Sequence, residues 1–440
     1  MYYVTRPQRL SLFALAILLC VAAQAAAQAG HLDPTFANKG IFATTTGEST
    51  ANAVAIQSDG KVVIAGTGVA NSALTDTLIR LNTDGTLDAS FGSGGVANFA
   101  PDTIVFGFFA LSIQPDGKII AAADGALNGR QPDMRVARVN TDGTLDTSFG
   151  SGGFTTAQVF PLESGNLALQ PDGKILVAAG VDNPNGVPSE MARFTASGQL
   201  DTTFGNGVGM INLAYPGPTQ IAVQSNGKIL VAAGEAARLV NQAQPAAQPG
   251  SITRYNSNGT LDKTFGSSGS ASSLASASAL LLQSDGKIVV AGALTSKLNP
   301  PPSANDVGFG IARYSSNGVI DRSFGTGGIA IVDFGVNAPV SGAFALAIQS
   351  NGDLVAAGAA GGTLSGNRIT SSFGLARFTS AGKLDTTFGS GGRVITTVAS
   401  GQYSWVASLA IQSDGKIVAA GTAQFNTDND NAYVARYLAQ

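Results

Sequence analysis

Residues 53–61 read AVAIQSDGK, and close variants of this stretch return six more times along the chain. Small alanine side chains alternate with the branched Val54 and Ile56 up to Gln57, and a Ser-Asp-Gly turn then leads to Lys61. Alternation with a period of two predicts a β-strand, and Asp-Gly or Asn-Gly after such a strand is the strongest short signal for a hairpin. The glutamines of the seven copies are Gln57, Gln114, Gln170, Gln224, Gln283, Gln349 and Gln412.

Two further motifs recur seven times each. One is a short strand centred on an arginine: Arg80, Arg138, Arg193, Arg254, Arg313, Arg377 and Arg436. The other is Leu-Asp-x-x-Phe, usually followed by glycine, with its aspartate at Asp33, Asp88, Asp146, Asp201, Asp262, Asp321 and Asp385. With the β-branched partner of the glutamine strand and a strand after the phenylalanine, each unit holds four short antiparallel strands, which is one propeller blade. The sequence therefore predicts an all-β, seven-bladed β-propeller with four-stranded antiparallel blades.

The spacing of the motifs predicts two unlike faces. Arginine precedes the next motif aspartate by eight residues in all six copies where both occur in order, and the glutamine precedes its hairpin position by four. In contrast, glutamine to arginine varies from 23 to 30 residues, and aspartate to the next glutamine from 21 to 28. In a four-stranded meander the connections between the first and second strands and between the third and fourth strands share one face of the disc, and these have constant length. The connection between the second and third strands and the link to the next blade share the other face, and their lengths vary. We call these the constant face and the variable face.

The two ends of the repeat region are complementary. The N-terminal copy has the aspartate motif without an upstream arginine strand, and the C-terminal copy has Arg436 with only four residues after it. Because a closed ring removes exposed sheet edges, we expect residues 40–47 to supply the outer strand of the blade that residues 405–438 form.

The pattern Leu-Asp-x-x-Phe-Gly-x-Gly-Gly, combined with Ile-Gln-Ser-Asp-Gly-Lys-Ile and Ala-Arg-Tyr, resembles the bacterial delta-60 repeat family. The resemblance covers residues 30–440, with small departures at Ala37 and at Ser268-Gly269. It implies an exported, propeller-like protein, and it supplies no catalytic residues. The order of strands is also similar to that of NHL-type propellers, which implies that the glutamine strand is innermost.

Residues 1–29 differ from the repeats. Two arginines precede the apolar run 10–23, and the small-x-small pattern Ala27-Gln28-Ala29 follows, which is typical of a secretory signal peptide. A membrane anchor and a lipoprotein cysteine at Cys20 are the alternatives. We expect a signal peptide at 1–29, a propeller at 30–440, and a secreted or periplasmic location. Association with the cell surface is an alternative. No later stretch is long and apolar enough to span a membrane. The net charge of −3 argues against nucleic acid as a partner, and we expect a monomer.

The repeated charges are expected to be structural. An arginine eight residues before an aspartate is placed to pair with it across a short turn, at below about 1 kcal/mol if the pair is exposed. The aspartate is expected to accept backbone N–H groups in an Asx turn. Calcium in one or two copies is the alternative, although several copies lack the carboxylates that a calcium cage requires. The glutamines are expected to form hydrogen bonds between blades first, and to line a channel second.

Few residues are suited to catalysis. His31 is the only histidine and lies beside the expected mature N-terminus, which argues against a catalytic triad and against a histidine-rich metal site. A hydrolase or lyase remains as an alternative, in which carboxylates of the insertion loops act as a pair. The candidates are Glu163, Glu190, Asp124 and Asp182.

The variable face is the predicted binding surface, because loops on a rigid scaffold concentrate binding residues. Its predicted loops include residues 234–251, 292–306 and 358–371. Unrepeated aromatic residues fall just before the predicted inner strands, and packing under the loops is the competing explanation for them. The candidate ligand-binding residues are Trp405, Tyr403, Phe109, Phe344, Tyr215 and Arg238. We therefore expect a module that binds a carbohydrate, a peptide or a protein, with a purely structural surface protein as a further alternative.

Overall fold

The computed structural model describes residues 28–440 except for 46–47, 71, 100–103, 127–132, 159–163, 181–188, 216, 235–249, 275, 294–307, 336–340, 366–367 and 425–429. These residues form 28 β-strands, and all secondary structure among them is β. Within the same residues, no helical segment has the length and hydrophobicity that crossing a bilayer requires. The predicted signal peptide lies outside them, apart from its last two residues.

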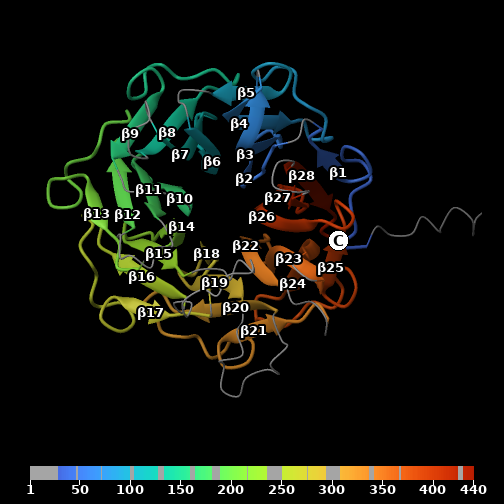
Figure 1. The fold of residues 1–440 in the computed structure, drawn as a ribbon. Coiled ribbons are helices and arrows are strands. Elements are labelled where there is room, and N and C mark those ends of the chain that lie inside the picture. Colours follow the sequence, from blue (N-terminus) through green and yellow to red (C-terminus); the bar gives the residue numbers. More distant parts are fainter. Residues whose placement is uncertain are drawn as a thin grey trace, which may run out of the picture.

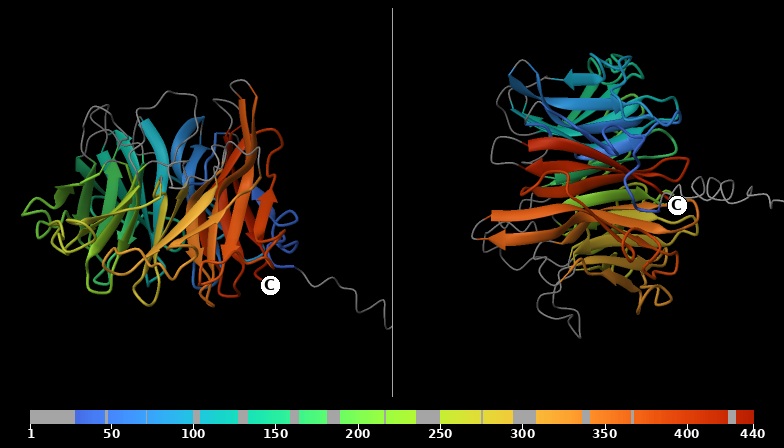
Figure 2. Two further views of the ribbon diagram at one scale, coloured as in Figure 1. Left: turned by 90° about the horizontal axis from the view of Figure 1, so that it is seen from below. Right: turned by 90° about the vertical axis from the view of Figure 1, so that its right-hand side faces the viewer.

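The strands form seven separate four-stranded antiparallel sheets arranged as blades around one axis (Figure 1; Figure 2 shows two further views of the same ribbon). Blade 1 contains β2–β5, blade 2 β6–β9, blade 3 β10–β13, blade 4 β14–β17, blade 5 β18–β21 and blade 6 β22–β25. Blade 7 has the strand order β1-β28-β27-β26. The prediction of a seven-bladed β-propeller is confirmed.

The strand that precedes each motif glutamine is the innermost in its blade, as Figure 1 shows. The innermost strands are β2 (Ala53–Ile56), β6 (Ile104–Ile113), β10 (Ser164–Leu169), β14 (Pro218–Val223), β18 (Ala279–Leu282), β22 (Gly342–Ile348) and β26 (Tyr403–Ile411). The second strands are β3 (Val62–Ala70), β7 (Ile119–Ala126), β11 (Ile175–Gly180), β15 (Ile229–Ala233), β19 (Ile288–Ala293), β23 (Leu354–Ser365) and β27 (Ile417–Gln424).

The third strand of each blade carries the motif arginine, and the outer strand follows the motif phenylalanine. The third strands are β4 (Ala73–Leu81), β8 (Asp133–Val139), β12 (Glu190–Phe194), β16 (Ser251–Tyr255), β20 (Phe309–Tyr314), β24 (Arg368–Phe378) and β28 (Asp430–Tyr437). The outer strands are β5 (Val96–Phe99), β9 (Phe154–Gln158), β13 (Met210–Asn212), β17 (Ser270–Ser272), β21 (Ile329–Val332), β25 (Arg393–Thr396) and β1 (Ile41–Ala43).

The N-terminal strand closes the ring. β1 pairs antiparallel with β28, with Phe42 opposite Val434, and so becomes the outer strand of blade 7. Figure 1 shows β1 at the blue end of the chain beside the red strands of the C-terminal end. The sequence-based expectation for residues 40–47 is consistent with this sheet.

The hydrophobic core lies between the blades. The described residues form seven clusters, and each joins side chains of two neighbouring blades. In β3, for example, Val62 and Ile64 contact blade 7, whereas Val63 and Ala65 contact blade 2. Successive side chains of a strand point to opposite faces, and here both faces are buried. The second strands therefore read as continuous apolar runs, and no blade can bury its faces without both neighbours.

One predicted loop is mostly sheet. Residues 358–371 were expected to be irregular, but β23 and β24 pair from Leu354↔Phe378 out to Ser365↔Arg368 and form a long hairpin. Gly361 and Gly362 lie at an irregularity between the Ala360 and Thr363 pairs. A bulge accommodates residues that would interrupt a regular strand.

Deleting residues 30–47 should sharply lower the thermal midpoint. The deletion removes β1 and also Phe36, which is fully buried in the cluster between blades 7 and 1. It would expose one edge of β28 and open that cluster. Differential scanning calorimetry of this deletion beside a chain that begins at Gln28 provides the measurement, and equal midpoints would contradict closure by β1.

Candidate functional site

The constant face carries one repeated side-chain box per blade, and blade 4 provides an example. Nε of Arg254 donates to Oδ2 of Asp262 at 2.7 Å, and Nζ of Lys228 donates to the same oxygen at 2.6 Å. The other carboxylate oxygen accepts the backbone N–H and the hydroxyl of Thr264, at 3.1 and 2.6 Å. The guanidinium carbon lies 4.7 Å from the ring centre of Phe265.

The same box is present in all seven blades, except that blade 6 has Asp353 in place of the lysine. The arginine–aspartate hydrogen bonds measure 2.7–2.9 Å, and the arginine lies over the motif phenylalanine at 4.5–4.8 Å. In each copy the Ser or Thr two residues after the aspartate donates both its backbone N–H and its hydroxyl to the carboxylate. The phenylalanine N–H donates to the aspartate's backbone carbonyl instead of its side chain.

Each box also binds the next blade. A terminal guanidinium nitrogen donates to a backbone carbonyl in the turn between the third and fourth strands of the following blade. In order from Arg80 to Arg436, the accepting carbonyls belong to Thr141, Ala196, Ser257, Ser316, Ser380, Ala439 and Thr83. The arginines therefore link the seven blades into a closed ring of hydrogen bonds.

Most of these pairs are buried, so the small value expected for an exposed pair does not apply. Arg254 is 3% exposed and Asp262 is 4% exposed. A buried ion pair is strongly destabilised when one partner is removed. Because the guanidinium groups and carboxylates bind one another and the backbone, the boxes serve the scaffold and offer little to a ligand.

The network lowers the pKa of the motif aspartates. Burial of Asp33 opposes its ionisation, but hydrogen bonds from Thr35 and Lys416 and the charge of Arg436 lower its pKa to about 2. Burial of Asp201 also opposes its ionisation, but hydrogen bonds from Thr203 and the charge of Arg193 lower its pKa to about 2. The pKa values of the other five motif aspartates are lowered as well.

The motif glutamines also reach across blade boundaries. Nε2 donates to a backbone carbonyl of the next blade from Gln57, Gln224, Gln349 and Gln412, at 3.0–3.4 Å. The inter-blade role that the sequence predicted for the glutamines is therefore seen in these four blades.

Four of the predicted aromatic residues lie within the innermost strands, not before them, and Tyr215 precedes its inner strand as expected. Tyr403 and Trp405 begin β26, Phe344 is the bulged residue of β22, and Phe109 lies at a bulge of β6. Tyr215 lies in the link after β13 and is 36% exposed. Arg238 lies outside the described residues.

Two of these aromatic residues form a half-exposed pair. The rings of Tyr403 and Trp405 lie 5.1 Å apart with an interplanar angle of 32°. Between and beyond them, Ser404 and Val406 are fully buried and point toward blade 6. The alternation of β26 therefore turns Tyr403 and Trp405 to the opposite face, where they are half-exposed.

Other aromatic residues near the channel serve packing between blades. The ring of Phe109 lies so close to Gly165 of blade 3 that a Cβ on Gly165 would be 2.8 Å from it. Phe108 is fully buried between blades 1 and 2. The packing explanation therefore holds for these two residues.

The candidate carboxylates are spread over different elements. Glu163 and Asp182 lie outside the described residues, and Glu190 is the first residue of β12, the third strand of blade 3. Asp124 lies in β7 and is 6% exposed, and its burial together with the charge of Asp76 raises its pKa to about 7, against the effect of Arg135.

The sequence-based predictions did not include a buried ion pair between blades 1 and 2. Arg135 of β8 pairs with Asp76 of β4, and both side chains are at most 3% exposed. No other blade repeats this pair among the described residues. The available signal was a charged residue inside each strand, Asp76 in ALTDTLIRL and Arg135 in DMRVARV, in addition to the repeated motif arginine.

Metal sites and cavities give no further candidate in the described part of the chain. It contains no group of three or more His, Cys, Asp or Glu side chains that could hold a metal, and calcium stays an untested prediction.

Two open depressions lie on the outer rim. One of about 820 Å³ is lined by residues of the ring closure and of β25, and one of about 530 Å³ lies between β9 and β13.

Comparison with protein families supports a β-propeller repeat family. Residues 57–91, 114–149, 170–204, 283–324 and 412–440 match a family described as "Domain of unknown function (DUF5122) beta-propeller". A comparison with curated proteins found no match.

Solved structures with a similar fold have varied roles. They include virginiamycin B lyase from Staphylococcus aureus, with 11% identity, 89% of this chain and 97% of that chain covered, and a TM-score of 0.44. Sqt1 from Chaetomium thermophilum has 14% identity, covers 89% and 96%, and has a TM-score of 0.43. A protein from Lactobacillus plantarum has 11% identity, covers 83% and 92%, and has a TM-score of 0.46. Likenesses at this level carry no information on the activity of this chain.

Replacing Arg254 by alanine should lower the free energy of unfolding by about 3–5 kcal/mol, because it leaves the buried Asp262 with one cationic partner and removes a bond to blade 5. Chemical denaturation measures the change. Arg322→Ala is the matched control, because Arg322 is exposed beside a motif aspartate, and it should change stability by less than about 0.5 kcal/mol. Equal effects would show that the boxes contribute no more than surface charge.

Stability should fall steeply in acid. A carboxylate with a lowered folded-state pKa stabilises the fold above its unfolded value of 3.8, and this contribution is lost as the pH falls through the folded value. Asp33 and Asp201 therefore place the loss between about pH 4 and pH 2. Asp124 acts oppositely, because its raised pKa gives stability that is lost as the pH rises from about 4 to about 7. Thermal midpoints from pH 2 to 8 test both signs, and Asp124→Asn should remove only the second.

Proposed function

We propose that this chain is an exported β-propeller that acts as a binding or interaction module and holds its ligand on the variable face. The observation that carries the proposal is the half-exposed pair of Tyr403 and Trp405 at the start of β26. Partly exposed pairs of aromatic rings are typical of binding surfaces, since Tyr and Trp provide apolar area together with a polar atom.

The constant face is a poor alternative. Its arginines, aspartates and phenylalanines contact one another in every blade, and its arginines also bind the next blade. A ring of seven like boxes also lacks the asymmetry by which a site orients a ligand. The remaining candidate surface is the variable face, at the opposite ends of the strands, where the side chains differ from blade to blade.

Polar groups accompany the aromatic pair. Across blade 7, Tyr403 pairs with Gln424, and Gln424 pairs with Asp430. Residues opposite each other in a sheet point to the same face, so these three side chains are neighbours. Gln424 is exposed, and Oδ1 of Asp430 is buried without a hydrogen-bond partner among the described residues. Burial raises the pKa of Asp430. An aromatic surface with a few polar groups suits a carbohydrate, a peptide or a protein segment.

Export and family membership belong to the same proposal. The pattern of residues 1–29 supports a signal peptide and hence a secreted or periplasmic protein. The repeated motifs support membership of the delta-60 repeat family. The expectation of a monomer also stays part of the proposal.

A hydrolase or lyase is the second candidate, and the raised pKa of Asp124 favours it. A carboxyl group that titrates near neutrality is suited to general acid–base catalysis. This candidate predicts turnover of a glycan or peptide that Asp124→Asn abolishes, whereas the binding module predicts retention without turnover.

Replacing Trp405 or Tyr403 by alanine should weaken ligand retention at least tenfold, which is about 1.4 kcal/mol, and leave the thermal midpoint nearly unchanged. Glycan-array and secretome pull-down screening of the purified propeller identifies the ligand. Trp405 is the only tryptophan, so its fluorescence then reports binding directly.

Two controls separate binding from folding. Val319→Ala changes a residue that is 63% exposed on the constant face, and it should leave retention unchanged. Phe109→Ala should lower the thermal midpoint, because its ring packs on blade 3. If both Trp405→Ala and Tyr403→Ala retain the ligand like the parent chain, the site is elsewhere. If no ligand and no turnover are found, a structural role is favoured.

A further inference from the structure

One turn of the ring is built from both ends of the described chain. In blade 1 the turn between the third and fourth strands is continuous, and Gly85 donates to the carbonyl of Asn82 at 2.9 Å while Asn82 donates to Thr86 at 2.8 Å. In blade 7, Gly30 donates to Leu438 at 2.8 Å and Leu438 donates to His31 at 2.9 Å. Gly30 and Gly85 share a φ of +83°. Residues 29–31 and 438–439 therefore reproduce the repeated turn across a chain break.

Ala29 has a defined place in this turn. In six blades the residue after the motif phenylalanine donates its N–H to a turn carbonyl of the next blade. These bonds run from Ala37, Gly92, Gly150, Gly205, Gly266 and Gly325 to Asp84, Asp142, Ser197, Asn258, Asn317 and Ala381. The seventh runs from Gly389 of blade 6 to the carbonyl of Ala29 at 2.8 Å. Ala29 thus carries one of the seven equivalent links between blades.

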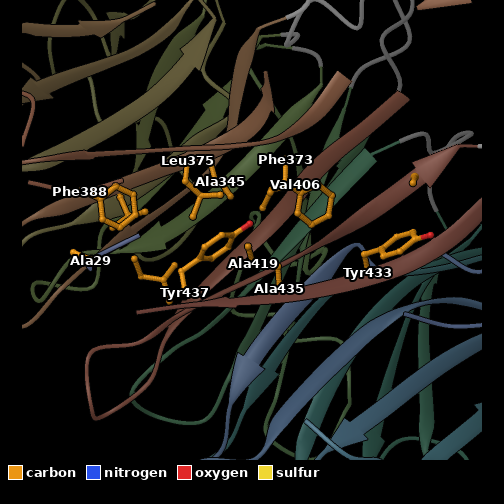
Figure 3. Close-up of a cluster of buried hydrophobic side chains, with 14 of the residues drawn as sticks. Ala29, Ala345, Phe373, Leu375, Phe388, Val406, Ala419, Tyr433, Ala435 and Tyr437 are labelled. Carbon is orange, nitrogen blue, oxygen red and sulfur yellow. The ribbon is translucent and has the colours of Figure 1, made fainter. Parts of the chain in front are cut away.

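The side chain of Ala29 is part of the core. Ala29 is 6% exposed and belongs to the cluster between blades 6 and 7, together with Phe388 and Tyr437 (Figure 3). Gly30 is also buried, and a Cβ there would lie 2.7 Å from the nitrogen of Gly389. Gln28, in contrast, is exposed. The boundary between packed and exposed chain therefore lies between Gln28 and Ala29.

We infer that the mature chain keeps Ala29, and that the leader is removed at the Ala27–Gln28 bond and not after Ala29. The inference rests on the proposed export. Ala25-Ala26-Ala27 offers a small-x-small site that ends at this bond. Hydrolysis there adds the hydroxyl of water to the carbonyl carbon of Ala27 and a hydrogen to the nitrogen of Gln28.

The physical reason is the cost of the alternative cut. Cleavage after Ala29 would place the new α-ammonium group on the buried Gly30, and burying an unpaired charge is unfavourable. It would also remove the acceptor of the Gly389 N–H and the methyl group packed beside Phe388. A cut before Gln28 places the ammonium group on an exposed residue and keeps every contact of Ala29.

N-terminal sequencing and intact mass of the full chain, exported by a bacterial host, test the inference. The expected mature protein begins at Gln28. A mature protein that begins at Gly30 would overturn the inference while leaving export intact. A chain that stays in the cytoplasm with its leader attached would instead refute export, so the two failures can be told apart.

Two variants place the cut independently. A leader peptidase requires a small residue just before the cleaved bond, so Ala27→Leu should block processing and Ala29→Val should leave the processed end at Gln28. The reverse pattern would overturn the inference.

The thermal midpoint tests the physical reason. Propellers released from a removable fusion partner, beginning at Gln28 or at Gly30, differ only in residues 28–29. The shorter chain should melt at a temperature several degrees lower, and equal midpoints would show that Ala29 does not stabilise the ring closure.

Discussion

The bond from each motif arginine to a carbonyl of the next blade is the interaction on which the rest of the structure depends. A blade is a thin sheet with two apolar faces, and its core clusters are shared with both neighbours. Its stability is therefore a property of the junctions. The arginine joins the turn of its own blade, through the aspartate and the phenylalanine, to the backbone of the next. Seven such junctions close on themselves, and Arg436 bonds back to Thr83 of blade 1.

Blade 6 shows which part of the box is essential. Asp353 stands where the other copies have lysine, so Asp385 lacks the lysine partner found in the six other boxes. The Arg377–Asp385 bond still measures 2.7 Å, and Arg377 still reaches the carbonyl of Ala439. A guanidinium group supplies several donors in a fixed plane, whereas an ammonium group is a point charge. The arginine can therefore serve two blades at once, and the half-exposed lysine adds charge to a geometry that is already complete.

Much of the fold was predictable because it repeats. Seven copies of Gln57, Arg80 and Asp88 at fixed spacing indicate strands, turns and the ring closure together. Contacts that occur once leave no such pattern. The pair of Asp76 and Arg135 joins residues 59 apart in different blades, and only the stacking of those blades brings them together. The strand assignment of Tyr403 and Trp405 failed for a related reason. The inner strands differ in length from four residues in β2 to ten in β6, since each follows its own links and not the repeat.

The channel mouth shows how far the repeat extends along each inner strand. Five positions before the motif glutamine, the seven blades carry Asn52, Phe109, Gly165, Thr219, Ser278, Phe344 and Ala407. Several still join neighbouring blades: Asn52 donates to the carbonyl of Phe108, Thr219 to that of Ala277, and Phe109 covers Gly165. Residues five positions before the motif glutamine therefore still pack between blades, although their types already differ from blade to blade. Trp405 and Tyr403 lie seven and nine positions before Gln412, beyond this level, and both are half-exposed. Ser404 between them still packs against blade 6, but the two rings on the other face of β26 keep part of their surface in solvent. Such unrepeated, partly exposed groups are the means by which an otherwise symmetric scaffold can carry a specific site.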